Sequence, residues 1–570
     1  MKRHGLDVWS RVFFGILLLF FGVFLLYPVA LILRRGFGLE GQWTLRHFLL
    51  IFESPLLRES LLNSLWIAAM TTVLATGLAL PLAHWLTRYQ FRGRGVLNSL
   101  LLVPMIMPPF VGAIGLKQLL GRFGTLNLAL GRLGVECDVD WLGNGGLTGI
   151  ILLQVFSLFP VLLLNLSAAM ANVDPALREA AQSLGAPGWR LFRTITLPLI
   201  LPGWFAGAIL VFIGSFTDLG TPLVFGYGRV VPVQIFDAVN DLNTNPQGYA
   251  LVMVVLLITA VLFVLSRRWV GSRRYEMLSR GHTQGGEVPA DGWTTCLIWG
   301  ISGPLIVMAL LPHLAVVLQS LSERWFFSVL PSAWTARNFV DVFDQNGAAL
   351  AIRNSLFYSS LSAVVDLFLG VLIAWLLTRR RVRFAGILDV LAMMPLALPG
   401  LVLAFGYVAA FDFDAKQHPW FGTWMNPREN PTLLLIISYS VRRLPYIVRS
   451  AYAGFQQTSV SLEEASASLG ASPWTTLRRI TLPLVSAHLV AGTVLTFSFA
   501  MLEVSDSLIL AQREKFYPIT KQLWQVMGRI DPNAPGLASA LGVVGMILLT
   551  GSLLVAGRLL GKRLGQLFRA

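Results

Sequence analysis

Charged side chains are scarce in this 570-residue sequence, since Asp, Glu, Lys and Arg together make up only 13% of it. Soluble domains typically carry about 25% charged residues. Hydrophobic residues make up 55% of the chain, and its mean hydropathy is +0.67. This balance excludes an ordinary soluble globular protein and predicts a chain that lies in a lipid bilayer.

Other signals are missing as well. The only cysteines are Cys137 and Cys296, and the predicted topology places them on opposite sides of the bilayer, which excludes a disulfide framework. The net charge of +15 forms no basic stripe interleaved with aromatic residues, so we expect no nucleic-acid partner. There is no G-x-x-x-x-G-K-S/T phosphate loop and no cluster of nucleophile, base or metal ligands. We therefore expect no catalytic residues, no metal site and no ATPase activity on this chain.

The apolar residues are gathered in segments that are long enough to cross a bilayer core of about 30 Å. Twelve such segments fall near residues 12–33, 60–87, 95–119, 147–170, 199–222, 250–270, 293–320, 353–377, 385–412, 432–453, 484–511 and 537–560. The first is longer than the core of a signal peptide and has no cleavage site after it, so we expect it to be retained. A Gly- and charge-rich linker at 276–292 separates a first half, 1–275, from a second half, 293–570.

The two halves repeat one another. Adding 285 to a residue number carries Pro160 to Pro445 and Pro198 to Pro483, and adding 291 carries the pair Asn63-Ser64 to Asn354-Ser355. Each half has an even number of spans, so the second half enters the membrane in the same direction as the first. The predicted fold is an all-α integral membrane protein of about 12 transmembrane helices, arranged as two parallel six-helix repeats. Inverted repeats, which many ion-coupled secondary transporters use, would need an odd number of spans in each half.

Lys and Arg in the short loops set the orientation. Their clusters fall on one side of the membrane if twelve spans alternate, with Arg34 and Arg35 as a mild exception. This side is predicted to be the cytoplasm of a bacterial cell, with the protein in the inner membrane and both termini on the cytoplasmic side.

The most informative repeat is a polar stretch that occurs at 174–198 and again at 459–483. In the first copy, Asp174 is expected to cap a short helix that Gly185 ends in a left-handed conformation, and Pro187 is expected to open a second helix. In the second copy, Ser461 and Glu464 are expected to form a capping box, with Gly470 and Pro473 in the later roles. Small residues on the short helix favour docking against a protein surface, and the alternative is an interfacial helix under the bilayer.

These residues resemble the EAA loop of ABC importer permeases. In the first copy the matching residues are Glu179, Ala180, Ala181, Gly185, Ile195, Leu197 and Pro198. In the second copy they are Glu464, Ala465, Ser466, Gly470, Ile480, Leu482 and Pro483, with Ser466 in place of the usual Ala. The resemblance covers essentially the whole chain. Within this family, the chain most resembles fused double permeases for ferric iron, thiamine or 2-aminoethylphosphonate. The stretches "SFTDLGTPLVFGY" and "RRLPYIVRS" carry this narrower likeness.

The resemblance implies partners and a mechanism. Each EAA loop would dock one of two copies of an ABC ATPase subunit, which would bind ATP and Mg, so this chain would hold no cofactor of its own. A periplasmic or extracellular solute-binding protein would deliver the solute to outer loops at 120–146 and 413–430. Ferric iron is the preferred solute, ahead of 2-aminoethylphosphonate, another organophosphate or thiamine. An ion-coupled secondary transporter is the alternative class, and a membrane enzyme comes third.

Charges inside the predicted spans are candidates for the solute pathway. Asp218 and Glu503 are related by the 285 offset and would bring two carboxylates to a shared axis, which suits a cation or an amine. Arg442 and Arg443 have no basic counterpart in the first half and would suit phosphate or phosphonate oxygens. For both pairs the alternative is neutralisation by opposite charges inside the bundle.

The remaining polar residues of the spans are expected to be structural. Asp366 is interpreted as a hydrogen-bond partner between helices, and His84 and His313 have no second ligand at metal spacing. Pro104 and Pro108, with Pro395 and Pro399 at the equivalent places, are expected to break the third and ninth spans, either as gating bends or as static kinks.

Overall fold

The computed structural model describes residues 3–38, 43–135, 138–143, 145–186, 188–242, 246–272, 287–344, 346–380, 384–412 and 423–560. Within these ranges nine helices are long and apolar enough to cross a membrane: Val8–Gly36, Pro55–Arg88, Leu147–Ala171, Gly188–Phe225, Gln247–Leu265, Gly292–Ser320, Gly347–Arg379, Trp474–Met501 and Ala534–Val555. Two bent helix pairs supply two more spans, and α21 (Thr432–Gln457), which carries three arginines, occupies the remaining predicted span. The predicted all-α membrane fold is confirmed.

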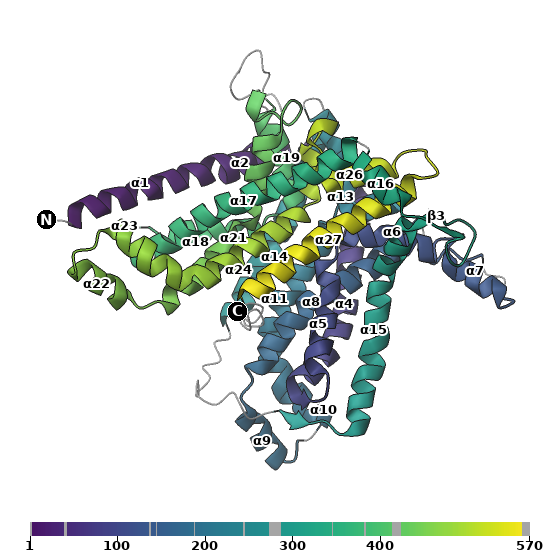
Figure 1. The fold of residues 1–570 in the computed structure, drawn as a ribbon, viewed down its shortest axis with the longest axis horizontal. Helices are drawn as coiled ribbons and strands as arrows, with labels where there is room; N and C mark the ends of the chain where they lie inside the picture. Colours follow the sequence, from purple (N-terminus) through teal and green to yellow (C-terminus); the bar gives the residue numbers. More distant parts are fainter. Residues whose placement is uncertain are drawn as a thin grey trace.

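The first half contains these elements: α1 Arg3–Phe21, η1 Gly22–Leu26, α2 Tyr27–Gly36, α3 Arg46–Glu53, α4 Pro55–Arg88, β1 Tyr89–Gln90, α5 Arg94–Ile106, α6 Pro109–Leu120, α7 Thr125–Arg132, α8 Leu147–Ala171, α9 Pro175–Ser183, α10 Gly188–Leu191, η2 Phe192–Thr196, α11 Leu197–Phe216, α12 Gly220–Phe225, α13 Val231–Ala238, η3 Val239–Asp241 and α14 Gln247–Ser272. Figure 1 shows their arrangement.

The remaining elements are β2 Val288–Pro289, α15 Gly292–Ser320, β3 Ser322–Arg324, β4 Ala333–Trp334, α16 Arg337–Asp344, α17 Asn346–Arg379, α18 Gly386–Met393, η4 Met394–Leu396, α19 Gly400–Phe411, α21, α22 Val460–Ser468, α23 Pro473–Thr476, η5 Leu477–Thr481, α24 Leu482–Met501, α25 Ser505–Leu510, η6 Glu514–Phe516, α26 Ile519–Met527 and α27 Ala534–Leu560. The strands form two short pairs, β1 with β2 in parallel and β3 with β4 antiparallel.

Pro108 and Pro399 break the third and ninth spans, as the sequence predicts, whereas Pro104 lies inside α5 and Pro395 inside η4. The chain bends by 91° between α5 and the helical segment that begins at Pro109, and by 104° between the α18–η4 segment and α19. Pro108 and Pro399 sit at the bends with extended backbones, at ψ 120° and 138°. Because a proline disfavours helical geometry in the residue before it and supplies no N–H, the helix ends there and a new one begins.

The internal repeat of the sequence is also a repeat of contacts. The Asn63 side chain donates to the Arg229 carbonyl at 3.0 Å, and the Val231 N–H donates to Ser64 Oγ at 2.9 Å. In the second half Asn354 donates to the Tyr517 carbonyl at 3.2 Å, and the Ile519 N–H donates to Ser355 Oγ at 2.8 Å. The same Asn-Ser pair therefore fastens the loop before the sixth span of each half.

The first membrane span of each half packs against helices of the other half. The α2 and α1 helices pack against α19, α17 and α18, and the Tyr407 hydroxyl donates to the Phe24 carbonyl at 2.7 Å. The α15 helix packs against α6, α5 and α8 of the first half, as Figure 1 shows, and also against α27 of its own half. The linker ends on the same side, where Glu287 pairs with Arg94 at 3.0 Å. Residues 276–286 of the predicted linker lie outside the described residues.

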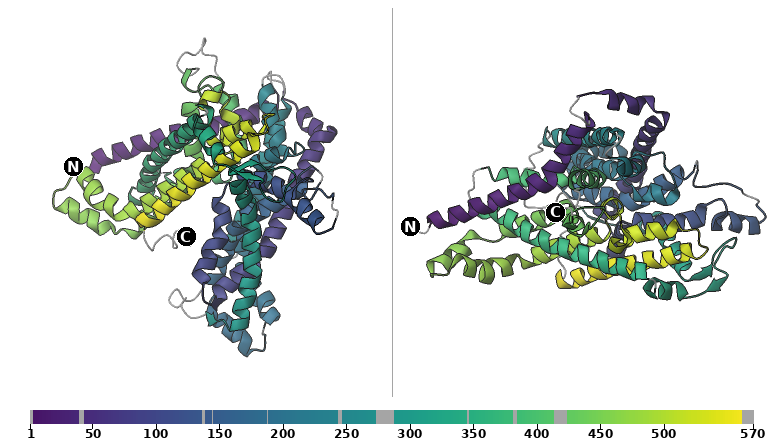
Figure 2. Two further views of the ribbon diagram at one scale, coloured as in Figure 1. Left: turned by 45° about the vertical axis from the view of Figure 1, so that its right-hand side comes forward. Right: turned by 90° about the horizontal axis from the view of Figure 1, so that it is seen from above.

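The helices form two legs that diverge from a shared core (Figure 2). One leg holds α4, α5, α8, α11 and α15, and the other holds α1, α17, α18, α21 and α24. The largest hydrophobic cluster joins residues of both halves, including Phe216, Phe405 and Tyr439. Two smaller clusters each belong to one leg, around Phe159 and around Phe455. Each leg therefore has an interior of its own below the common core.

Candidate functional site

The two repeated polar stretches form the ends of the two legs, where Figure 1 shows α9 and α22. Asp174 caps α9 by accepting a hydrogen bond from the Ala176 N–H at 2.9 Å. After α9 the chain turns through Gly185, whose φ is +78°, and α22 turns likewise through Gly470, whose φ is +85°. Left-handed φ values of this kind favour glycine, so the glycine in each copy is explained by backbone geometry.

The predicted capping box at Ser461 and Glu464 is wrong. The N-cap of α22 is Ser459, whose Oγ accepts the Ser461 N–H at 3.3 Å, so Ser461 lies inside the first turn. Ser459 stands 285 positions after Asp174 and occupies the same place in its loop. The chain is extended at Thr458 and at Ser459, with ψ 122° and 132°, and the helix begins at Val460.

A second helix follows each turn and runs without interruption into the membrane. The first is continuous from Gly188 to Phe216 through α10, η2 and α11, and the second is continuous from Pro473 to Met501 through α23, η5 and α24. Both contain one π-helical turn at the same position, η2 and η5, separated by the 285 offset. Pro187 lies outside the described residues, and Pro473 is the first residue of α23. Each loop is therefore helix, turn, helix, and it is joined rigidly to the span that follows it.

The exposed face of each loop carries apolar side chains that the sequence interpretation missed. Leu184 is 87% exposed and Leu469 is 89% exposed, and each directly precedes the left-handed glycine. Trp189 and Trp474 are also exposed, at equivalent positions. Glu179, Ala180, Glu464 and Ala465 lie on exposed parts of the two helices. A large apolar residue at a helix C-cap, repeated at the 285 offset, was the signal in the sequence that marks this face.

The third residue of each Glu-Ala-Ala motif does not belong to this face. Ala181 and Ser466 are both buried. Ser466 Oγ lies 2.9 Å from Thr476 Oγ1, and the residue equivalent to Thr476 in the first loop is the buried Leu191. The change from Ala to Ser is therefore matched by a change from Leu to Thr inside the loop, and the exposed surface is unaffected.

The second candidate site is a cavity of about 230 Å³ where the two halves meet. Its lining is Pro109, Gln154, Ser157, Leu158, Gly214, Thr217, Asp218, Gly400, Arg442 and Ser505. Asp218 accepts hydrogen bonds from Gln154 Nε2 at 3.0 Å and from the Gly220 N–H at 3.1 Å. A partly exposed carboxylate that faces a cavity can interact with a cation or a hydrogen-bond donor.

Glu503 is arranged differently from its counterpart Asp218. It is only 3% exposed and pairs with both Arg442 and Arg443. Arg442 also lies 3.7 Å from Asp506, which accepts a hydrogen bond from Ser438 at 2.8 Å. These four charged residues, Arg442, Arg443, Glu503 and Asp506, are called the arginine cluster below. Every member belongs to the second half.

The ends of the two homologous helices do approach one another, since a Cβ at Gly220 would lie 3.0 Å from Val504. The two acids nevertheless point to different partners, Asp218 to Gln154 and Glu503 to the arginines. Only Asp218 and Arg442, of the four predicted pathway residues, line the cavity. Gln154 and Asp506 were missed, because neither is related by the repeat to a residue of the same type.

Other polar residues of the spans have structural surroundings. Ser440 donates to Asp366 at 2.6 Å, which links α21 to α17. His313 is buried where α15 packs on α6, within van der Waals range of a Cβ at Gly112. Among the described residues, no three His, Cys, Asp or Glu side chains are grouped so that they could hold a metal ion.

Known proteins match the chain along most of its length. The family described as "Binding-protein-dependent transport system inner membrane component" matches twice, at residues 75–273 and 366–566. The ferric transport system permease protein FbpB of Actinobacillus pleuropneumoniae is 27% identical over 543 residues, which cover 94% of this chain and 75% of that protein. The molybdenum transport system permease protein ModB of Haemophilus influenzae is 28% identical over 225 residues, which cover 38% of this chain and 95% of that protein.

Proposed function

The chain belongs to the family of binding-protein-dependent transport system inner membrane components, and on this basis we propose that it is the permease subunit of an ABC importer for ferric iron. Two family matches in one chain mean that both permease halves are fused. The protein is accordingly a multi-pass component of the inner membrane. We propose further that both termini lie in the cytoplasm, because the basic loops of both halves fall on that side.

The observation that carries the proposal is the pair of matching exposed loops. Each presents a leucine and a tryptophan at equivalent positions, beside an exposed glutamate, at the end of one leg. Apolar side chains this exposed are typical of surfaces that a partner covers. Two copies of an ABC ATPase subunit, one on each loop, would cover them. ATP and Mg would be bound by those subunits.

The continuous helices that follow the two loops would carry the motion of the ATPase subunits to the membrane spans. Closure of the two ATPase subunits on ATP would move α9 and α22 together, and the legs would follow because each loop continues into a membrane span. The cavity at the shared core would then open outward to receive solute from a periplasmic or extracellular binding protein. Of the outer loops expected to receive it, residues 413–422 lie outside the described residues.

Ferric iron is favoured over an anionic solute by two observations. The relative that covers 94% of the chain is a ferric transport system permease. The guanidinium of Arg442, which a phosphonate would need, is already engaged by Glu503 and lies near Asp506. The Asp218 carboxylate accepts neutral donors instead. We therefore rank 2-aminoethylphosphonate and other organophosphates below iron on both observations, and thiamine, which is a cation, below iron on the similarity to the ferric permease alone.

Reconstitution with the cognate ATPase and binding protein tests the proposal. We expect radioactive ferric iron to accumulate in proteoliposomes only with ATP, and Leu184→Asp combined with Leu469→Asp to abolish co-purification of the ATPase subunit. Leu133→Asp, at an exposed leucine of the predicted outer loop, is the control and should leave co-purification intact. Uptake that persists without ATP would refute the importer, and uptake of phosphonate or thiamine in place of iron would refute the assigned solute.

A further inference from the structure

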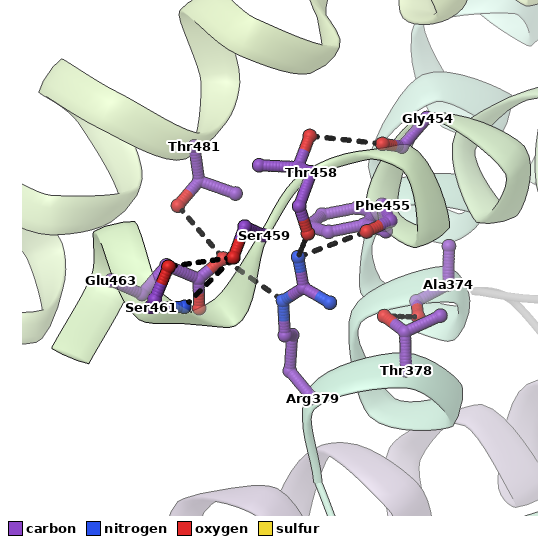
Figure 3. A network of polar contacts seen from close by, with 10 residues as sticks. All are labelled: Ala374, Thr378, Arg379, Gly454, Phe455, Thr458, Ser459, Ser461, Glu463 and Thr481. Atoms are coloured by element: carbon purple, nitrogen blue, oxygen red, sulfur yellow. Dashed lines mark hydrogen bonds and ion pairs between the residues drawn. The ribbon is translucent and has the colours of Figure 1, made fainter.

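The two repeated stretches at 174–198 and 459–483 are called the first and second coupling loops below. One arginine at the end of α17 holds the second coupling loop to the membrane helices (Figure 3). Arg379 Nε donates to Glu463 Oε1 of α22 at 2.9 Å. Its Nη2 donates to the carbonyls of Phe455 and Thr458, at the end of α21, at 2.9 and 2.8 Å. Thr481 of η5 donates to the same Glu463 oxygen at 3.3 Å. We call this network the Arg379 tether.

The Arg379 guanidinium joins α17 to α22 and to the end of α21, and the Glu463 carboxylate adds η5 through Thr481. Arg379 is only 7% exposed, and its Cζ lies 5.6 Å from the centre of the Phe455 ring. The two carbonyls lie at the C-terminal end of α21, where the Phe455 carbonyl also accepts the Thr458 N–H at 3.3 Å, so the arginine adds a C-terminal cap to this helix. A shielded, charge-assisted network of this kind holds its members more firmly than an exposed ion pair. The α22 helix is thereby fixed to α17 and α21 and to the start of α24.

The first loop cannot form the same network. The residue equivalent to Arg379 is Arg88, the last residue of α4, which has the same length as α17. The residue equivalent to Glu463 is Arg178, so the acid is replaced by a second base. Among the described residues Arg88 makes no hydrogen bond or ion pair with the first loop, and its Cζ lies 5.9 Å from the Tyr89 ring instead. The Ser466–Thr476 hydrogen bond is also restricted to the second loop.

We infer that Arg379 and Glu463 are positioning residues that make the second loop the more rigid coupling element, while the described residues of the first loop form no matching charged network. The inference rests on the proposed function, because it concerns how the two ATPase strokes reach the membrane. The two strokes are then unequal, and most of the mechanical work enters through α22.

Backbone hydrogen exchange of the isolated permease tests the rigidity without any transport. The amides of α22 should exchange on the order of tenfold more slowly than those of α9, as expected for one charge-assisted network. Glu463→Gln keeps the side-chain shape and should raise α22 exchange to the level of α9. Arg178→Glu restores an acid at the position equivalent to Glu463 and should slow the exchange of α9. Equal exchange of both helices in the wild type would overturn the inference.

The reconstituted complex tests the consequence for coupling. Glu463→Gln should leave ATPase co-purification unchanged and lower the solute moved per ATP on the order of three- to tenfold. Arg88→Ala is the matched control in the first half and should change neither. An equal loss in both variants, or a loss in neither, would overturn the inference. If the wild-type complex neither binds the ATPase nor transports, the proposed function fails instead, and the exchange experiment still decides the tether.

Discussion

Replacing Gly400 by alanine should disrupt the arginine cluster although none of the four residues of the cluster is substituted. Gly400 begins α19, directly after Pro399, and lies under the Arg442 guanidinium. A Cβ at this position would stand 2.5 Å from Nη2 and closer still to Cζ and Nη1. Carbon atoms of real side chains need about 3.4 Å or more, so the guanidinium has to move by about 1 Å. A shift of that size removes it from Glu503 and from Asp506.

The expected loss of stability in Gly400→Ala depends on which contacts of the arginine cluster remain. Losing a hydrogen bond to a charged group costs about 1.5–3 kcal/mol, and removing one partner of a buried ion pair costs about 3–5 kcal/mol. Arg443 stays on Glu503 and Ser438 stays on Asp506, so neither acid is left alone. We therefore expect Gly400→Ala to destabilise the permease by about 2 kcal/mol.

The assay is the midpoint of heat-induced loss of monodisperse protein in detergent. Gly77→Ala is the control, because it lies inside α4 with open space around it and should gain about 0.5–1 kcal/mol from the better helix former. In an Arg442→Ala background the clash no longer exists, so Gly400→Ala should cost nothing there. The reasoning is refuted if Gly400→Ala behaves like Gly77→Ala, or if it costs as much without Arg442 as with it.

Three further predictions concern the loops, the cavity and one buried lysine. Gly185→Val or Gly470→Val should strain the left-handed turn by about 1–2 kcal/mol and weaken co-purification of the ATPase, whereas Gly131→Ala, in open space, should not. Asp218→Asn should lower iron uptake on the order of tenfold while ATPase binding is retained, and unchanged uptake would remove Asp218 from the pathway. Burial lowers the pKa of Lys521 from 10.5 to about 8, so the folded state binds fewer protons than the unfolded state between these values. Thermal stability should then rise as the pH increases from 8 towards 10.5, and Lys521→Met should flatten this rise.

The repeat in the sequence predicted more than any local pattern did. The offset of 285 places the caps Asp174 and Ser459, the left-handed glycines and the two π-helical turns at matching sites. The capping box at Ser461 and Glu464 is absent although the Ser-x-x-Glu pattern is present, because the residue that the repeat aligns with Asp174 is Ser459. A residue type that recurs at the same position of both copies is constrained by the packing of both legs. A motif that occurs in one copy alone has no such second constraint, so it predicts the local structure less well.

The partners of the buried charges could not be predicted. Sequence spacing puts Asp218 and Glu503 at the same height in homologous helices, but it does not say toward which helix each side chain turns. Glu503 turns to α21 because Arg442 and Arg443 lie there, and their first-half counterparts are Ser157 and Leu158. Without those bases Asp218 takes Gln154 and a backbone N–H. The packing of α1 and α15 against helices of the other half could not be predicted either, because an apolar sequence does not specify which helices a span will contact.

The distribution of buried charge fits a molecule whose legs move apart. The arginine cluster lies wholly within the second half, and so do the Asp366–Ser440 bond and the Arg379 tether. The Gln154–Asp218 bond lies wholly within the first half. Around the approach of Gly220 to Val504, by contrast, the neighbouring side chain is the apolar Phe110. Splitting a buried ion pair costs several kcal/mol, whereas sliding apolar surfaces costs only in proportion to the area exposed. Sliding at this place would therefore leave the arginine cluster, the Asp366–Ser440 bond, the Arg379 tether and the Gln154–Asp218 bond intact.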